Sequence, residues 1–534
     1  MDPISEVETI IIELLLVISL VAIVVQYLRI PYTVALVIGG LILGFVEPLP
    51  VELTSELILA FFVPPLIFEA AFHLDFKELR ENMRFLLVLA VPGVILTMLV
   101  VGYILTWATA LPLATALVFG ALVSATDPVS VIALFRTLGV PKRLTALVEG
   151  ESLLNDGTAI VVFNVVLAIA LTGQFDAAES VVDFIKVVAG GVSVGLLLGW
   201  LTANLIARVD NHLIETTLTT VLAYGSYLLA EQFHFSGVLA VVTAGIINGN
   251  IGPRGMSPTT RIILSNFWEY AAFLANSLIF LLIGLQIRIP DLLESWQPIL
   301  AAIVAVLVAR MIVVYILSHI VRRGEPIPLS WRHVLAWGGL RGAISLALAL
   351  SLPPQLGFAN RELLQVMAFG VVLFTLFVQG MTIGPLVSRL KINAVDALQQ
   401  EYELRHARLV ALQEAEKHLD ALYRKGLVTR YTWENLKPSL SKQTSELANS
   451  VRDLLHSNPA LASRALESAR RELLRAQRSA LLSLKVDGVI SDPTFEQLAI
   501  EIDTLLGEPD LPELPTDNER SSAQESARET VSAD

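Results

Sequence analysis

In Gly150-Glu151-Ser152-Leu153-Leu154-Asn155-Asp156-Gly157-Thr158, two carboxylates, an amide and two hydroxyls interrupt an apolar run that extends from about residue 144 to 172. A helix of this length can cross the roughly 30 Å hydrocarbon core of a bilayer. On such a helix, Ser152 and Asp156 share one face, and Glu151 and Asn155 share a second face about 100° away. One face can therefore present oxygen atoms to a cavity while the other contacts a neighbouring helix.

The polar segment belongs to a chain that is short of charge for water. The 534 residues are 54% hydrophobic and 16% charged, whereas soluble domains carry about 25% charged residues. Residues 1–391 hold 46 charged residues, and the last 143 residues hold 41. Since about 20 apolar residues are needed for each crossing, the first part divides into thirteen predicted spans, at about 9–28, 31–46, 54–72, 85–107, 112–135, 144–172, 182–207, 213–231, 235–249, 263–287, 297–321, 333–352 and 363–388. The sequence predicts an all-α polytopic membrane protein followed by a soluble tail.

The basic residues between these spans indicate an orientation. With the N-terminus outside, the inner loops hold 15 Lys and Arg residues and the outer loops hold 3, as the excess of positive charge in cytoplasmic loops requires. We therefore expect a transmembrane domain at 1–392 in the cell membrane and a helical cytoplasmic tail at 393–506. The remaining stretch, 507–534, is acidic and rich in Pro, Glu and Ser, and it is predicted to be disordered.

Composition also excludes several classes of protein. The chain has no cysteine, so it forms no disulfide and no Cys-ligated metal site. Its net charge is −13, and it has no basic patch of the kind that binds nucleic acid. No cofactor is expected. A charge at the centre of a membrane helix costs about 2.5–3.5 kcal/mol even on insertion scales. The chief charged residues within the predicted spans should therefore face one another or water: Glu69, Asp127, Glu151, Asp156, Arg310 and Arg341.

Two of the predicted spans contain helix-breaking residues. Thr126-Asp127-Pro128 places a proline in the middle of the fifth span, where the proline removes a backbone donor. Such a break is tolerated in a membrane only where it lines a cavity or is buried in protein. Asp127 can offset the positive end of an exposed half-helix. In the twelfth span, Gly338, Gly339 and Gly342 surround Arg341, which is expected to offset the negative end of its own broken helix.

Short matches between the two halves suggest an inverted repeat. Leu66-Ile67-Phe68 in the third span recurs as Leu278-Ile279-Phe280 in the tenth, and the Gly-rich fifth span has a counterpart in the twelfth. Both pairs are separated by seven spans. Because seven is odd, the copies run in opposite directions through the membrane, as they do in many secondary transporters.

Four motifs, in this order, resemble the Na⁺/H⁺ antiporters of the NhaP/NHE type, the monovalent cation:proton antiporter-1 family. They are Pro64-Pro65-Leu66-Ile67-Phe68-Glu69, Ala125-Thr126-Asp127-Pro128, Glu151-Ser152-Leu153-Leu154-Asn155-Asp156-Gly157 and Gly338-Gly339-Leu340-Arg341-Gly342. The resemblance covers about residues 10–390 and leaves out the tail. It implies the NhaA-like antiporter fold, with an inverted repeat and broken helices that cross, and a homodimer.

The resemblance also implies a role for each site residue. Asp156 would be the carboxylate for which Na⁺ and H⁺ compete, and the cation shell would be completed by Ser152, Asp127 and the backbone carbonyl of Thr126. Glu69 would contribute through water, and Asn155 would steady the site. Glu151 would pair with Arg310, in Val308-Ala309-Arg310. Asn at position 155 implies electroneutral exchange of one Na⁺ or Li⁺ for one H⁺.

Other interpretations remain open at this point. Asp156 could belong to a buried structural pair, Asp127 could cap a helix end, Glu69 could be solvated, and Arg341 could act only on a helix dipole. Selectivity could favour K⁺ or Ca²⁺ over Na⁺, since it depends on cavity geometry. A gated cation channel and a membrane scaffold acting through the tail are the alternatives outside antiport.

Overall fold

The computed structural model describes residues 3–27, 30–46, 54–209, 211–252, 258–321, 327–392, 397–486 and 489–507. Within these ranges the regular structure is helical and contains no strand. The chain divides into two compact units, Met1–Ala394 and Val395–Asp534. The polar segment 150–158 lies in the first unit.

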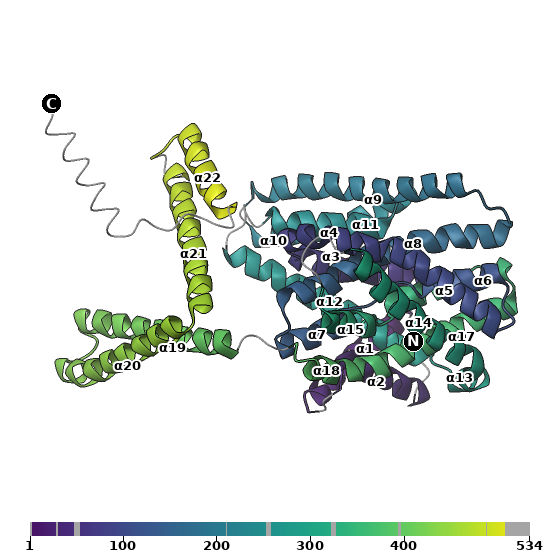
Figure 1. Ribbon diagram of the computed structural model, residues 1–534, viewed down its shortest axis with the longest axis horizontal. Helices are drawn as coiled ribbons and strands as arrows, with labels where there is room; N and C mark the ends of the chain where they lie inside the picture. Colours follow the sequence, from purple (N-terminus) through teal and green to yellow (C-terminus); the bar gives the residue numbers. More distant parts are fainter. Residues whose placement is uncertain are drawn as a thin grey trace. The chain divides into compact units, whose positions relative to one another are not determined.

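The helices of the first unit follow the predicted apolar runs with a few differences (Figure 1). The α4 helix begins at Phe76 instead of residue 85, because the Asp75 side chain accepts a hydrogen bond from the Lys77 N–H and caps an amphipathic first turn. The short helix α13 (Ile289–Glu294) lies where a loop was predicted. The other elements are α1 (Pro3–Val25), α2 (Tyr32–Val46), η1 (Leu57–Phe62), α3 (Val63–His73), α4 (Phe76–Ala90), α5 (Pro92–Ala108), α6 (Leu113–Leu122), α7 (Val129–Leu138), α8 (Lys142–Thr172), α9 (Ala177–Ile206), α10 (His212–Gln232), α11 (Gly237–Asn250), α12 (Pro258–Gln286), α14 (Trp296–Ile320), α15 (Leu329–Trp337), α16 (Ala343–Leu350), η3 (Pro354–Leu356), α17 (Phe358–Phe374), η4 (Thr375–Gln379) and α18 (Gly380–Arg389).

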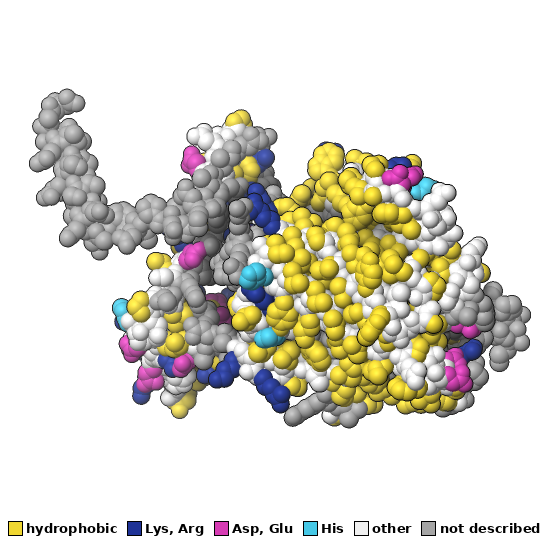
Figure 2. Space-filling view, turned by 45° about the vertical axis from the view of Figure 1, so that its right-hand side comes forward, with side chains coloured by type: hydrophobic (Ala, Val, Ile, Leu, Met, Phe, Trp, Pro, Cys, Tyr) yellow, Lys and Arg dark blue, Asp and Glu magenta, His cyan; other side chains and the backbone are white. Residues whose placement is uncertain are grey.

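Six helical segments of the described chain are long and apolar enough to cross a membrane: Phe76–Ala108, Lys142–Thr172, Ala177–Ile206, Thr260–Gln286, Trp296–Ile320 and Asn360–Arg389. Figure 2 shows that hydrophobic side chains cover most of the visible face of the first unit, with charged side chains toward its edges. Large apolar residues such as Trp107 and Trp200 are exposed, as expected for a surface that faces lipid. The first unit is a multi-pass membrane domain. The number of thirteen crossings stays a prediction, because the other apolar helices are only 10–17 residues long.

The polar segment of α8 is enclosed because two glycines let neighbouring helices approach it. A Cβ atom added to Gly150 would lie 2.9 Å from Leu86 of α4, and one added to Gly157 would lie 2.5 Å from Leu239 of α11. Real Cβ contacts are essentially never shorter than 3.0 Å. Helices α4, α6 and α11 all pack against α8. As a result, Glu151, Ser152, Asn155 and Asp156 are buried inside the bundle.

In its described residues, the second unit contains four helices: α19 (Ala397–Arg424), α20 (Arg430–Ser457), α21 (Pro459–Val486) and α22 (Asp492–Gly507). α19 packs against α20, and α21 packs against α22. Trp433 of α20 donates a hydrogen bond to the Asp420 carboxylate of α19, at 2.8 Å, and stacks on Tyr423 with ring centroids 4.9 Å apart. The predicted disordered stretch lies outside the described residues from position 508 onward.

Candidate functional site

Two of the predicted spans are interrupted, and the interruptions lie against each other. α6 ends at Leu122 and α7 begins at Val129, while α15 ends at Trp337 and α16 begins at Ala343. We call 123–128 the first break and 338–342 the second break. The Asp127 N–H of the first break donates to the Leu340 carbonyl of the second, at 2.8 Å. The four half-helices therefore meet at one place inside the bundle.

Arg341 ties the second break to the first. Its guanidinium is buried and donates to the carbonyls of Ser124, at 2.8 Å, and Ala125, at 3.0 Å. These carbonyls directly follow the end of α6, so the positive charge lies at the negative end of that half-helix. The sequence predicted that Arg341 offsets the end of its own broken helix. Instead, its guanidinium donates hydrogen bonds to the other break, because the crossing brings the C-terminal end of α6 close to Arg341.

Asp127 lies between the first turns of two half-helices. Its Oδ1 accepts a hydrogen bond from the Val129 N–H, at 3.0 Å, and so caps α7. A Cβ atom added to Gly342 would lie 2.1 Å from Asp127 Oδ2, so only glycine allows the carboxylate to lie this close to the start of α16. The carboxylate thus faces the positive ends of two half-helices. Capping and charge compensation both apply to Asp127.

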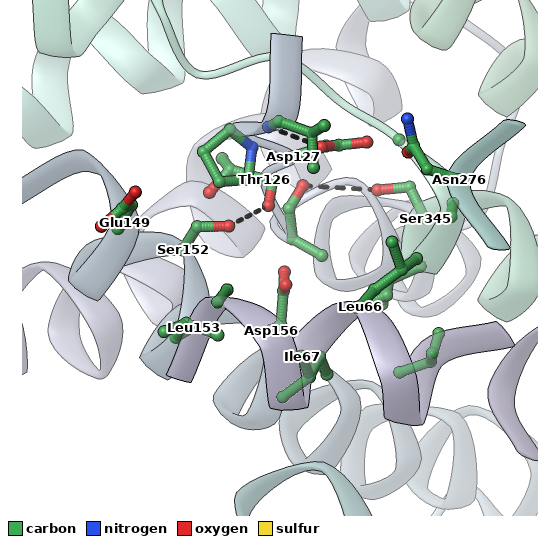
Figure 3. Close-up of a pocket in the computed structure, with 18 residues that line it drawn as sticks. Leu66, Ile67, Thr126, Asp127, Glu149, Ser152, Leu153, Asp156, Asn276 and Ser345 are labelled. Atoms are coloured by element: carbon green, nitrogen blue, oxygen red, sulfur yellow. Dashed lines mark hydrogen bonds between the residues drawn. The ribbon is translucent and has the colours of Figure 1, made fainter. Parts of the chain in front are cut away.

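Helix α8 is fastened to the first break by two polar side chains. The Ser152 hydroxyl donates to the Thr126 carbonyl (Figure 3). The Asn155 amide donates to the Ser124 carbonyl, at 2.9 Å, and to the Thr126 hydroxyl, at 3.2 Å. These bonds place the predicted cation ligands Ser152 and Thr126 beside each other and hold Asn155 against the first break.

A cavity of about 80 Å³ lies where α8 meets the breaks. Asp156, Asp127, Ser152 and Thr126 line it, and the Asp156 side chain points toward the first break (Figure 3). Among the described residues, Asp156 Oδ1 and the neighbouring Asn155 Oδ1 are buried without a hydrogen-bond donor. Buried polar atoms are rarely left unpaired, and hard cations prefer carboxylate and carbonyl oxygens. The arrangement can therefore hold a dehydrated monovalent cation or a proton.

Three polar residues of the cavity were not predicted from the sequence: Glu149, Asn276 and Ser345. Ser345 donates to the Ala125 carbonyl, at 3.4 Å, from the first turn of α16. Asn276 immediately precedes Ser277 and the repeated Leu278-Ile279-Phe280. Its position beside this motif could have indicated it as a site residue. Glu149 precedes Ser152 by three residues and Asp156 by seven, so helical spacing alone could have placed it on the same face of α8.

Glu69 is not part of the cavity lining in the described structure. Its Oε1 lies 3.2 Å from Nδ1 of His73, one turn further along α3. His73 Nε2 in turn lies 2.8 Å from the Ser265 hydroxyl of α12. Glu69 therefore belongs to a polar group at the end of α3, beside the cavity and outside it.

Glu151 and Arg310 form a buried ion pair on a different face of α8. The guanidinium donates to both carboxylate oxygens, at 2.6 and 2.8 Å, and Arg310 Nη2 also donates to the Leu335 carbonyl, at 3.0 Å. Both side chains are buried. A Cβ atom added to Gly339 would lie 2.6 Å from Arg310 Nε. The second break thus has one glycine against each charged group, Gly339 against Arg310 and Gly342 against Asp127.

Comparisons with known proteins agree with this architecture. The model of the family described as "Sodium/hydrogen exchanger, transmembrane" matches residues 14–389. The Na⁺/H⁺ antiporter NhaG of Bacillus atrophaeus is 40% identical over 483 residues, which cover 88% of this chain and 91% of the relative. The Na⁺/H⁺ antiporter ApNhaP of Aphanothece halophytica is 44% identical over 398 residues, which cover 74% and 76%.

A solved structure extends the likeness to the fold. The sodium proton antiporter MjNhaP1 from Methanocaldococcus jannaschii, at pH 8, aligns with a TM-score of 0.61 over 73% of this chain and 99% of that chain, at 24% identity. The first unit therefore has the helical antiporter fold of that protein. The resemblance inferred from the four sequence motifs is confirmed by the family match and by the relatives. The chain belongs to the sodium/hydrogen exchanger family, the monovalent cation:proton antiporter-1 family, whose members are secondary transporters and not enzymes.

Proposed function

We propose that this chain is a Na⁺/H⁺ antiporter in which Na⁺ and H⁺ compete for Asp156. The observation that carries the proposal is the buried Asp156 Oδ1, which has no hydrogen-bond donor among the described residues and faces a cavity lined by oxygen atoms. Relatives named as Na⁺/H⁺ antiporters, with 40% and 44% identity, supply the identity of the ions.

Each group at the cavity has a distinct part in the exchange. The Asp156 carboxylate binds either the cation or the proton. The Ser152 hydroxyl, from the same face of α8, and the Thr126 carbonyl and Asp127 carboxylate, from the first break, supply further oxygen ligands to Na⁺. Asn155 holds the first break against α8 through its bonds to Ser124 and Thr126. Glu69 acts from outside the lining, through water.

The charges at the crossing favour electroneutral exchange. At the crossing itself, the carboxylates Asp127, Glu151 and Asp156 accompany the guanidinium groups Arg310 and Arg341, so these five side chains carry a formal net charge of −1. One Na⁺, one Li⁺ or one proton neutralises it. Because uncompensated buried charge is costly, the loaded site can move between the two sides of the membrane, whereas the empty anion moves poorly. This difference enforces exchange of one cation for one proton.

We further propose alternating access between two inverted repeats, whose broken helices are α6–α7 and α15–α16. Their hydrogen-bonded crossing supports a shared site that both halves can close over. The protein would work as a homodimer in the cell membrane with thirteen crossings. Its N-terminus would lie outside and its tail in the cytoplasm, as the distribution of Lys and Arg favours.

A proteoliposome assay tests the proposal. The purified chain is reconstituted with an acidic interior and a pH-sensitive dye, and Na⁺ is then added outside. We expect Na⁺ to raise the internal pH, and we expect Asp156→Asn to abolish the signal while the protein still elutes as a folded species. Asp183→Asn, which removes an exposed acid from α9, serves as the matched control. Na⁺-driven proton movement at the normal rate in Asp156→Asn would contradict the assignment.

The same assay separates the alternative functions. Replacing Na⁺ with Li⁺, K⁺ or Ca²⁺ measures selectivity, and we expect Na⁺ and Li⁺ to give the largest signals. An unchanged rate when valinomycin and K⁺ clamp the voltage at zero indicates electroneutral exchange. Current through a planar bilayer in the absence of a proton gradient would indicate a channel. Transport that survives deletion of 395–534 would argue against a scaffold that acts through the tail.

A further inference from the structure

A second and larger cavity opens beside the first. It has a volume of about 490 Å³, and its charged and polar lining residues are His73, Asp75, Glu78, Arg136, Lys142, Thr145 and Glu149. Glu149 is the one residue that the linings of both cavities share within the described chain. In Figure 3 its side chain lies apart from Asp156 and Asp127, on the far side of Ser152.

Helix geometry connects the two cavities along one face of α8. Thr145 and Glu149 line the outer cavity, and Glu149, Ser152 and Asp156 line the inner cavity. The spacings of four, three and four residues place these side chains in a row. At a rise of about 1.5 Å per residue, Glu149 lies about 4.5 Å from Ser152 along the helix axis, and about 10.5 Å from Asp156. A cation moving along this face therefore meets an oxygen atom at each turn.

Apolar side chains also line the inner cavity. They are Val63, Leu66 and Ala70 of α3 and Leu153 of α8. A cation that loses its water between such side chains pays a high desolvation cost unless an anionic group replaces the water. Glu149 is half-buried at this point and lies within the electrostatic influence of Arg136, Glu69 and His73. The nearby Arg136 weakens the attraction between Glu149 and a cation. Passage requires such weak binding, because the cation has to leave Glu149 again.

We propose that Glu149 is a relay carboxylate, which receives the dehydrating cation from the outer cavity and passes it to Ser152 and Asp156. The inference rests on the proposed cation exchange at Asp156. Glu149 acts on the rate at which the cation moves between the cavities and leaves the affinity of the inner site unchanged. It contacts the ion in transit and is not a member of the final cation shell.

The test compares rate with affinity in Glu149→Gln, Glu149→Asp and Glu78→Gln of the full chain. Glu78 lines the outer cavity alone, so its variant removes the same charge without touching the shared wall. We expect Glu149→Gln to slow Na⁺/H⁺ exchange at low Na⁺ about tenfold in proteoliposomes, the effect of a barrier raised by roughly 1.4 kcal/mol. We expect Glu149→Asp to restore most of the rate, and Glu78→Gln to stay within about twofold of the parent protein.

Equilibrium binding of Na⁺, measured by titration calorimetry on the purified variants, supplies the second readout. The dissociation constant for Na⁺ of Glu149→Gln should stay within about twofold of the parent value, since a relay changes the rates of binding and release together. An unchanged transport rate would overturn the proposal, and so would a tenfold loss of Na⁺ affinity, which would make Glu149 a ligand of the inner site. Parent and Asp156→Asn proteins measured in parallel decide the proposed function separately.

Discussion

Two carboxylates on one helix, Glu151 and Asp156, are both buried, yet their surroundings differ. Both oxygens of Glu151 accept hydrogen bonds from the Arg310 guanidinium, at 2.6 and 2.8 Å. Asp156 Oδ1 accepts none from the described residues and faces the cavity. The two residues are five positions apart, so they project from different faces of α8.

The difference separates a group that holds the fold from a group that exchanges ligands. A carboxylate whose two oxygens are both held by a fixed guanidinium gains little from a passing cation. A buried carboxylate with a free oxygen is unstable as an anion, and it is stabilised by any small cation that reaches it. The comparison thus predicts that removing the charge of Glu151 and removing the charge of Asp156 have opposite effects on the stability of the folded protein.

The largest effect on stability is expected from Glu151→Gln. The substitution leaves Arg310 buried without its counter-charge, a change that costs about 3–5 kcal/mol when one partner of a buried pair is removed. We expect a marked fall in the unfolding temperature of the detergent-solubilised protein, followed by scanning fluorimetry. Asp156→Asn should leave that temperature unchanged or raise it, because it removes an unpaired buried charge.

A double variant sharpens this contrast. Glu151→Gln combined with Arg310→Gln removes both charges, so it should recover part of the lost stability. If the double variant is less stable than both single variants, the pair does not act as a unit. If Glu151→Gln unfolds at the same temperature as Asp156→Asn, the distinction between the two carboxylates fails.

A smaller effect is expected from Gly342→Ala, which acts at the cavity of Asp156 and not at the Glu151–Arg310 pair. The new Cβ atom would lie 2.1 Å from Asp127 Oδ2, so the carboxylate has to leave its place between α7 and α16. We expect transport to fall at least about tenfold, together with a loss of about 1–3 kcal/mol in stability, the usual cost of overpacking. Proteoliposome flux and scanning fluorimetry measure the two effects.

Gly225→Ala is the matched control, since nothing lies within 4 Å of a Cβ atom added there, in the middle of α10. Alanine in a helix interior stabilises by about 0.5–1 kcal/mol relative to glycine. Equal transport by both alanine variants would show that Asp127 tolerates displacement, and it would remove Asp127 from the cation shell.

The local features of the site could be predicted from the sequence because they depend on residues close together in the chain. Pro128 indicated the first break, and the glycines around Arg341 indicated the second. The spacing of Glu151, Ser152, Asn155 and Asp156 predicted two polar faces on one helix, and α8 directs one face to the cavity and Glu151 to Arg310.

The contacts between distant segments could not be predicted in the same way. Arg341 reaches carbonyls of the first break, more than 200 positions earlier in the chain, and only the crossing of the half-helices makes this contact possible. The resemblance directed attention to Glu69, whereas the cavity wall includes Glu149. Both carboxylates are near the cavity, and the way α3 packs on α8 decides which of them lines it.

A third carboxylate, Asp420 in the second unit, gives the smallest expected effect. Lys437 donates to both of its oxygens, at 2.9 Å, with Trp433 on one of them, and these hydrogen bonds lower the pKa of Asp420 below its ordinary value. A lowered pKa means that the pair stabilises the folded unit above the ordinary carboxyl range and that this stability is lost as the pH falls through the lowered value. Asp420→Asn should therefore speed amide hydrogen exchange in α19 and α20 slightly at pH 7. The difference should shrink in acid, and transport should be unchanged.

Glu414→Gln, in a pair whose side chains are more than 70% exposed, is the control and should change neither hydrogen exchange nor transport. A difference that persists unchanged in acid would show that the Asp420 pair contributes through packing of Trp433 and not through its charge.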